Sequence, residues 1–298
     1  MGKVFIDTAS ASMMPRTGLF QRWAARGFSI ADVLNALQPQ QGWRLQADIP
    51  YRGGARGMLD VYTPAIQAAT PAPVVIFFYG GSWQSGSRDL YRFVGASLAQ
   101  RGMVTFVPDY GVYPQKRYPD FLEDAAKAVR FARDNARRWN GAPEHLVVMG
   151  HSAGAYIAAM LAFDKRWLRG AGLDPVDHIA GLVGLAGPYD FLPIVDPVLQ
   201  DIFGGSDRID TQPIRYVGHG APPSLLIAPR ADKFVNPGNT TRLAAHIRSL
   251  SGVVTERHYP RIGHLSLIGA FSPMLRFLAP VLSDVTVFAR NPRGARQS

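Results

Sequence analysis

The sequence predicts a single doubly wound α/β domain with a mostly parallel sheet and a small cap insertion. Continuous apolar, β-branched runs such as "APVVIFFYGG" (72–81) and "MVTFVPDY" (103–110) are typical of strands buried on both faces. Segments with helical spacing separate these runs, which favours parallel strands joined by helices. The chain has 298 residues and is 47% hydrophobic, so it can bury one large core.

The first half of the chain contains a candidate hairpin followed by alternating strands and helices. Two strand-like segments, 43–52 and 57–64, flank the turn "GGAR". Between the two buried strands, "LYRFVGASLAQRG" (90–102) has helical spacing and a terminal glycine. The segment 118–139 then predicts a helix, because its apolar residues fall on one face.

The second half continues the alternation. Strands are expected at 145–150, 178–187, 223–230 and 254–260. Helices are expected directly after Ser152, over 239–252, and across most of 269–288.

The chain divides into an N-terminal arm (1–45), the main domain (46–290) and a basic tail (291–298). The insertion 187–220 interrupts the alternation and is too long for a plain connection. It is rich in turn-forming and aromatic residues. A cap over a site and an irregular loop with short helices both fit this composition.

The composition excludes several kinds of site and several classes of protein. The absence of cysteine excludes disulfides, thiolate metal sites and a cysteine nucleophile. The net charge of +10 comes from scattered basic residues, with no basic stripe interleaved with aromatics, so nucleic-acid binding is not expected. No apolar stretch reaches the roughly 18 residues of a membrane span. We expect a cytoplasmic monomer or homodimer acting on a small molecule, with a processed periplasmic or secreted form as the alternative. The basic surface could also bind anionic substrates or membranes.

The motif "GHSAG" (150–154) places Ser152 between an apolar strand and an alanine-rich helix. A G-x-S-x-G sequence at such a junction is typical of a nucleophile on a sharp, strained turn. Gly150 and Gly154 leave room for the neighbouring strand and helix. A plain glycine turn is the competing interpretation of the pentapeptide.

The loop "FFYGGSW" (77–83) follows an earlier strand and contains two glycines. Acyl transfer needs N–H donors aimed at the oxyanion of the tetrahedral intermediate. We expect the backbone amides of Gly81, Ser82 and Ala153 to form this oxyanion hole.

With these motifs in place, residues 48–277 resemble the α/β-hydrolase superfamily, on the branch of hormone-sensitive-lipase-like carboxylesterases and kynurenine formamidases. "LDVYTP", "YGGSWQSGS", "PDYGVYP", "GHSAGAYIAAM", "PRADKFVNPGNT" and "YPRIGH" follow the family's order. One departure is Tyr79, which stands where the family usually has the histidine of His-Gly-Gly. That histidine supports the loop, and a tyrosine hydroxyl could replace its hydrogen bonds.

The resemblance implies the chain order Ser, acid, His for a catalytic triad. His264 follows the last strand in the loop "RIGHLSL" and is the expected base. Asp232, after the strand 223–230, is the expected acid, and Asp190 in "GPYDF" is its rival.

The sequence therefore predicts a serine carboxylesterase that cleaves esters of small to medium acyl chain through an acyl-enzyme, with no metal and no cofactor. Trp83, Tyr110, Tyr189 and Phe191 are expected to contact the substrate from loops around the site. The alternatives are an aryl formamidase acting on N-formylkynurenine-type amides and a non-catalytic binding protein of the same fold.

Overall fold

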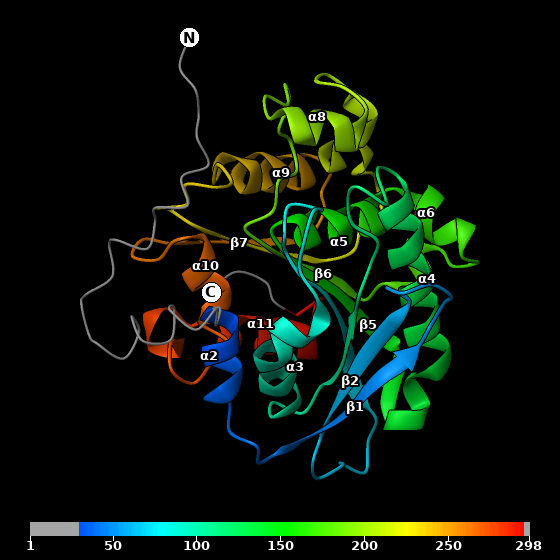
Figure 1. Cartoon of the computed structure of the whole chain (residues 1–298), viewed down its shortest axis with the longest axis vertical. Helices are drawn as coiled ribbons and strands as arrows, with labels where there is room; N and C mark the ends of the chain where they lie inside the picture. Colours follow the sequence, from blue (N-terminus) through cyan, green and yellow to red (C-terminus); the bar gives the residue numbers. More distant parts are fainter. Residues whose placement is uncertain (1–29, 295–298) are drawn as a thin grey trace.

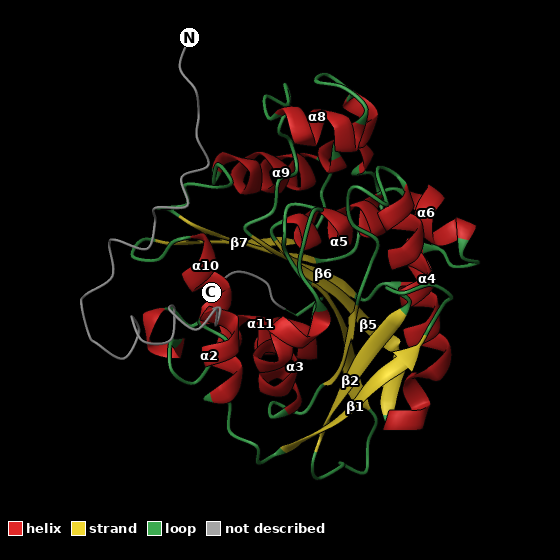
Figure 2. Ribbon diagram, in the orientation of Figure 1, coloured by secondary structure: helices red, strands yellow, loops and turns green. Residues whose placement is uncertain are grey.

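The fold is a twisted eight-stranded sheet with helices on both faces (Figures 1 and 2). The computed structural model describes residues 30–294. The strand order is β1-β2-β4-β3-β5-β6-β7-β8. The strands are β1 (Trp43–Pro50), β2 (Met58–Pro64), β3 (Ala72–Phe78), β4 (Val104–Pro108), β5 (Gly141–His151), β6 (Gly181–Leu185), β7 (Ser224–Pro229) and β8 (Val254–Tyr259).

Strand direction follows the sequence expectation. β1, β2 and β4 pair antiparallel, and every pair from β4 to β8 is parallel. β1 and β2 form the expected hairpin. The predicted doubly wound, mostly parallel architecture is therefore confirmed. β1 begins at Trp43, so the expected boundary between residues 45 and 46 falls inside a strand.

The central strands are apolar on both faces because both faces are covered. All residues of β4 and β6 are buried, as is β3 from Val74 to Phe78. Burying such side chains contributes about 1.5–3 kcal/mol each. The sheet centre therefore forms a rigid platform for the loops that leave the carboxyl ends of its strands.

The helices follow the pattern of their apolar residues. They are α2 (Ile30–Ala36), α3 (Arg92–Ala99), α4 (Asp120–Asn135), α5 (Ala153–Phe163), α6 (Lys165–Gly170), α7 (Pro175–His178), α8 (Pro197–Phe203), α9 (Gly238–Ser249), α10 (His264–Gly269) and α11 (Val281–Arg290). Every residue of α5 is buried, since this helix lies between the sheet and its neighbours. α3 and α11 lie together on one face of the sheet, and α4 and α5 on the other (Figure 1).

The C-terminal segment is less continuous than the helix expected over 269–288. α10 ends at Gly269, a short 3-10 turn spans Arg276–Leu278, and α11 starts at Val281. Pro273 and Pro280 lie between these pieces, and proline lacks the amide that would extend a helix.

The insertion 187–220 contains α8 and two 3-10 turns, Ile209–Thr211 and Pro213–Tyr216. Its backbone is fastened to the domain beneath it. The amide of Tyr118 donates to the carbonyl of Ile202 at 2.9 Å, and the hydroxyl of Tyr156 donates to that of Thr211 at 2.7 Å. None of the helices within residues 30–294 is long and apolar enough to cross a membrane.

Candidate active site

Ser152 lies at the junction of β5 and α5, in the turn 150–154 that we call the elbow, and it has a backbone conformation that L-residues rarely adopt. Its φ is 56° and its ψ is −123°, which marks local strain. The glycines on either side make this turn possible. A Cβ on Gly150 would lie 2.1 Å from the carbonyl oxygen of Gly154, and one on Gly154 would lie 2.0 Å from that of Phe78. Side chains at either position would collide with backbone.

His264 and Asp232 face each other near this turn. His264 is the first residue of α10, and its Nδ1 lies 2.7 Å from Oδ2 of Asp232. Both side chains are almost fully buried, at 6% and 1% exposure. With Nδ1 donating to the carboxylate, Nε2 of the neutral ring is left as an acceptor. This is the tautomer that a general base needs.

The Asp232 carboxylate is held in its charged form. Burial opposes ionisation, but hydrogen bonds from His264 and from the amides of Val235 and Phe234 outweigh it and lower the pKa of Asp232. Those two amides donate to Oδ1 at 3.0 and 2.9 Å. One carboxylate oxygen is thus fixed by the backbone, while the other orients the imidazole.

Asp190, the rival acid, is directed elsewhere. Its carboxylate pairs with Arg242 and is about one-third exposed. Another histidine after the nucleophile, His258, pairs with Glu256 on β8. Within the described residues, no group of three or more His, Asp or Glu is arranged to hold a metal ion.

His151, directly before Ser152, packs against His264. The two rings are 4.6 Å apart, and Nε2 of His151 lies 3.2 Å from the carbonyl oxygen of His264. Burial, together with the neighbouring His264, lowers the pKa of His151 to about 3. A neutral His151 therefore joins the elbow to the loop that carries the base.

The loop after β3 contacts the elbow from the side opposite to His264, because β3 and β8 lie on different sides of β5 in the sheet. A Cβ on Gly80 would lie 3.0 Å from that of Ser152, so the two backbones are in close contact. Three consecutive residues, Gly81, Ser82 and Trp83, have positive φ angles of 145°, 52° and 58°. Among residues 30–294, no hydrogen bond uses the amides of Gly81, Ser82 or Ala153 as donor. These are the three amides that the sequence assigned to the oxyanion hole.

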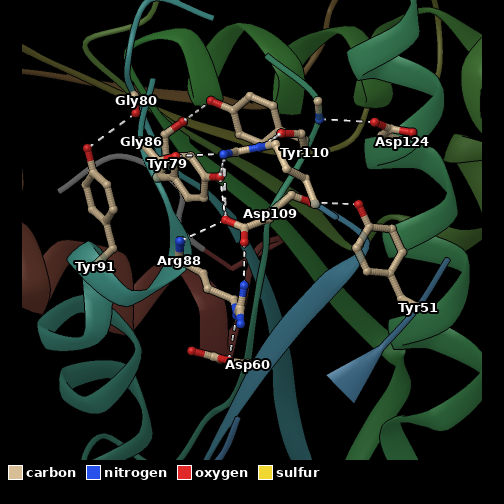
Figure 3. A network of polar contacts seen from close by, with 12 residues as sticks. Tyr51, Asp60, Tyr79, Gly80, Gly86, Arg88, Tyr91, Asp109, Tyr110 and Asp124 are labelled. Atoms are coloured by element: carbon tan, nitrogen blue, oxygen red, sulfur yellow. Dashed lines mark hydrogen bonds and ion pairs between the residues drawn. The ribbon is translucent and has the colours of Figure 1, made fainter. Parts of the chain in front are cut away.

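Tyr79, which replaces the family's histidine, lies in a buried polar network (Figure 3). Its hydroxyl donates to Oδ1 of Asp109 at 2.6 Å and accepts from Nη2 of Arg56 at 2.6 Å. Its ring stacks between those of Tyr91 and Tyr110, at 5.4 and 4.8 Å. Burial and the neighbouring Tyr110 and Asp109 raise the pKa of Tyr79, so its hydroxyl stays protonated.

The four aromatic residues expected around the substrate fall into two groups. Trp83 is buried, at 4% exposure, and stacks at 6.3 Å on the half-buried Phe191, in a cluster with Tyr156 of α5. Tyr110 and Tyr189 lie outside this cluster and have no exposed surface. The Tyr110 hydroxyl donates to the carbonyl of Tyr79 at 2.8 Å, which places this ring beneath the loop and not on the rim as expected. The Tyr189 ring packs against Gly184 of the interior strand β6 and against Gly187.

Sequence reasoning missed two members of this site. Arg56 belongs to the turn "GGAR", which predicts only a hairpin, and Asp109 belongs to "PDYG", which marks only the end of a strand. A charged residue directly after a strand without other charged residues was the available signal for Asp109. Nothing in the sequence connects Arg56 to a loop 30 residues away.

Comparison with known proteins agrees with this geometry. The BD-FAE family model matches residues 59–247. The chain is 29% identical over 203 residues to a probable isoprenylcysteine alpha-carbonyl methylesterase of Arabidopsis thaliana (64% of this chain, 48% of that protein). It is 30% identical over 154 residues to kynurenine formamidase of Danio rerio (52% and 50%). The chain thus spans about half the length of these curated relatives.

The fold is also found among solved structures. A truncated carbohydrate esterase from gut microbiota superimposes with a TM-score of 0.74 at 19% identity, covering 86% of this chain and 98% of that one. The family match extends over more than half of the chain and includes the elbow and the loop after β3. The protein therefore belongs to the BD-FAE family, on the esterase branch of the α/β-hydrolases.

Proposed function

We propose that the protein is a serine carboxylesterase acting on esters of small to medium acyl chain. The observation that carries the proposal is the strained Ser152 turn in contact with two other loops. One bears His264, which is oriented by Asp232 from the loop after β7, and the other contains amides that donate no hydrogen bond within residues 30–294. A nucleophile, an oriented base and free amide donors are the parts that acyl transfer needs.

In the proposed reaction, Nε2 of His264 accepts the proton of the Ser152 hydroxyl as the serine oxygen attacks the ester carbonyl. Asp232 stabilises the imidazolium that forms. The amides of Gly81, Ser82 and Ala153 donate to the oxyanion. His264 then returns the proton to the departing alcohol, and water, activated by the same base, releases the acid from the acyl-enzyme.

A second candidate is hydrolysis of an aryl formamide. The similarity to kynurenine formamidase favours it, as does the aromatic cluster formed by Trp83, Tyr156 and Phe191. Aromatic walls suit an aromatic amine as well as an acyl chain. The same serine, base and amides would serve either reaction, so the choice depends on the substrate.

The test compares p-nitrophenyl acetate, butyrate and octanoate with N-formylkynurenine, using wild type and Ser152→Ala. We expect ester turnover by wild type and a loss of at least about a thousandfold in the variant. Ser251→Ala is the matched control, because Ser251 is also a left-handed serine (φ 60°) but lies exposed after α9. It should retain full activity.

The other outcomes separate the alternatives. Rapid deformylation with poor ester turnover would assign the chain to the formamidases. A folded wild type that turns over none of these substrates would overturn the serine hydrolase proposal and favour a binding protein. A Ser152→Ala variant that keeps its activity would also overturn the proposal, because another group would then be the nucleophile.

A further inference from the structure

We propose that four residues, Arg56, Tyr79, Arg88 and Asp109, form a clasp that closes the base of the oxyanion loop (residues 79–88) and sets the direction of its amides. The proposal rests on the proposed function, because the loop acts on the reaction only if its amides receive an oxyanion. None of the four is assigned contact with the substrate. They are positioning residues.

The loop needs such a clasp because its own conformation is strained. Gly81, Ser82 and Trp83 are consecutive residues with positive φ, and two of them carry a side chain. Such conformations cost on the order of 1 kcal/mol each and persist only where the surroundings enforce them. Inside the loop, the carbonyl of Gly81 accepts from the amides of Gln84 and Ser85 at 2.9 and 3.0 Å, and the carbonyl of Trp83 accepts from the amide of Tyr113 at 2.8 Å. These bonds hold the middle of the loop, and its two ends are held by other partners.

The first part of the clasp is a single carboxylate oxygen shared by both ends of the loop. Oδ1 of Asp109 accepts from the Tyr79 hydroxyl at 2.6 Å and from the Arg88 amide at 2.9 Å. Tyr79 begins the loop and Arg88 ends it. Asp109 itself lies at the end of β4, directly beside β3, so the loop is closed onto the rigid part of the sheet.

The second part is Arg56, from the β1–β2 hairpin. Its Nη2 donates to the Tyr79 hydroxyl at 2.6 Å and to the carbonyl of Gly86 at 2.7 Å, while Nε donates to the carbonyl of Tyr110 at 2.6 Å. The guanidinium thus joins both ends of the loop again, at Tyr79 and at Gly86, two residues before Arg88. Its planar fork makes these bonds in fixed directions, which a lysine cannot do.

The clasp is also bonded to strand β2. The Arg88 guanidinium bonds the other oxygen of Asp109 and pairs with Asp60 of β2 at 2.9 Å (Figure 3). The buried carboxylate of Asp109 therefore has a partner on each oxygen. Because the Tyr79 hydroxyl stays protonated, it remains a donor to Asp109. Through the Tyr79 hydroxyl, the support of the loop thus reaches from the sheet to the hairpin.

Two variants remove different parts of the clasp without deleting bulk from the core. Tyr79→Phe keeps the stacked ring and loses only the hydroxyl. Arg56→Lys keeps the positive charge and loses the planar guanidinium that makes several hydrogen bonds in fixed directions. For each we expect kcat to fall about tenfold with KM changed less than twofold, a smaller loss than deleting an oxyanion donor outright. Affinity for a trifluoromethyl ketone, which forms a tetrahedral oxyanion, should fall by a similar factor.

A readout independent of turnover tests the clasp itself. Amide hydrogen exchange in peptides covering 79–88 should speed up about tenfold in Tyr79→Phe and remain unchanged elsewhere in the sheet. Tyr62→Phe is the matched control, since Tyr62 is a buried tyrosine of β2 whose hydroxyl takes no part in the hydrogen bonds of the 79–88 loop. It should match wild type in both measurements.

The results distinguish the two proposals. If wild type turns over ester and Ser152→Ala does not, but Tyr79→Phe keeps wild-type kcat and wild-type exchange, the clasp is overturned and the proposed function stands. If exchange in the loop rises but no ester or formamide is hydrolysed by wild type, the clasp stands as a structural device and the proposed function fails. A fall in kcat that only follows a lower folded fraction, as measured by active-site titration, also contradicts the clasp.

Discussion

Nδ1 of His264 lies 2.7 Å from Oδ2 of Asp232, across 32 residues of sequence. This contact joins the loop after β7 to the start of α10. The two oxygens of this carboxylate have different partners, because Oδ1 accepts from the amides of Phe234 and Val235. The imidazole is therefore oriented by a group that the backbone has already fixed.

Asp232→Asn should lower kcat by about 10³- to 10⁴-fold with little change in folding. The amide could donate to Nδ1 and would then favour the ring tautomer that cannot act as base. The measurement is steady-state hydrolysis of p-nitrophenyl butyrate. Asp190→Asn is the control, because Asp190 pairs with Arg242 and lies away from His264. If Asp190→Asn inactivates the enzyme and Asp232→Asn does not, the acid is assigned wrongly.

Gly154→Ala should lower the free energy of unfolding by about 3 kcal/mol and abolish activity. The added Cβ would lie 2.0 Å from the carbonyl oxygen of Phe78, and a backbone atom cannot move aside as a side chain can. Gly170→Ala is the matched control in the neighbouring helix, because its Cβ would meet nothing within 4 Å. Urea unfolding of both variants checks this. Equal stability of the two would contradict the packing argument.

The sequence predicts the sheet well because its strands carry unusually clear signals. Buried parallel strands read as continuous apolar runs, and β3, β4 and β6 are buried along most of their length. The elbow is equally predictable, because a turn that admits only glycine at positions 150 and 154 requires the G-x-S-x-G motif. Helix ends around 269–281 are less predictable, since apolar spacing alone does not say where two prolines will interrupt a helix.

Contacts between distant segments explain what the sequence could not predict. Tyr110 is an aromatic residue in a loop, a pattern equally typical of a binding wall and of core. Only its hydrogen bond to the carbonyl of Tyr79 shows that it supports the loop from below. Arg56 likewise reads as part of a hairpin turn until the fold brings that hairpin against Gly86. The sequence contains no periodic pattern that indicates which distant segment such a loop side chain will contact.

His151→Gln should make the protein less sensitive to mild acid. The pKa of His151 is lowered to about 3 by burial and by His264, whereas in the unfolded chain it is about 6.5. Between these values the unfolded state binds a proton that the folded state does not. Stability of wild type therefore falls as pH drops below about 6.5, by up to about 1.4 kcal/mol per pH unit from this group alone.

Urea unfolding of wild type and His151→Gln at pH 8, 6 and 5 measures this difference. At pH 8 the variant should be less stable, because the ring packing and the contact with the His264 carbonyl are lost. The gap should narrow by about 2 kcal/mol between pH 8 and pH 5. A gap that stays constant with pH would mean that His151 contributes packing only, and that its protonation is not linked to folding.

Phe191→Ala should shift the acyl-chain preference toward longer esters. Phe191 is half-buried and stacks on Trp83 beside Tyr156, which lies one helical turn after Ser152. Removing its ring opens space next to the elbow, and each methylene accommodated in an apolar pocket is worth about 1 kcal/mol or more. The ratio of kcat/KM for octanoate over acetate should therefore rise about tenfold. This ratio is independent of the fraction of folded enzyme.

Phe277→Ala is the control for this prediction, because Phe277 is an exposed phenylalanine outside the cluster, and it should leave the octanoate-to-acetate ratio unchanged. If Phe191→Ala also leaves the ratio unchanged, the cluster is packing beneath the 187–220 segment and the acyl chain binds elsewhere.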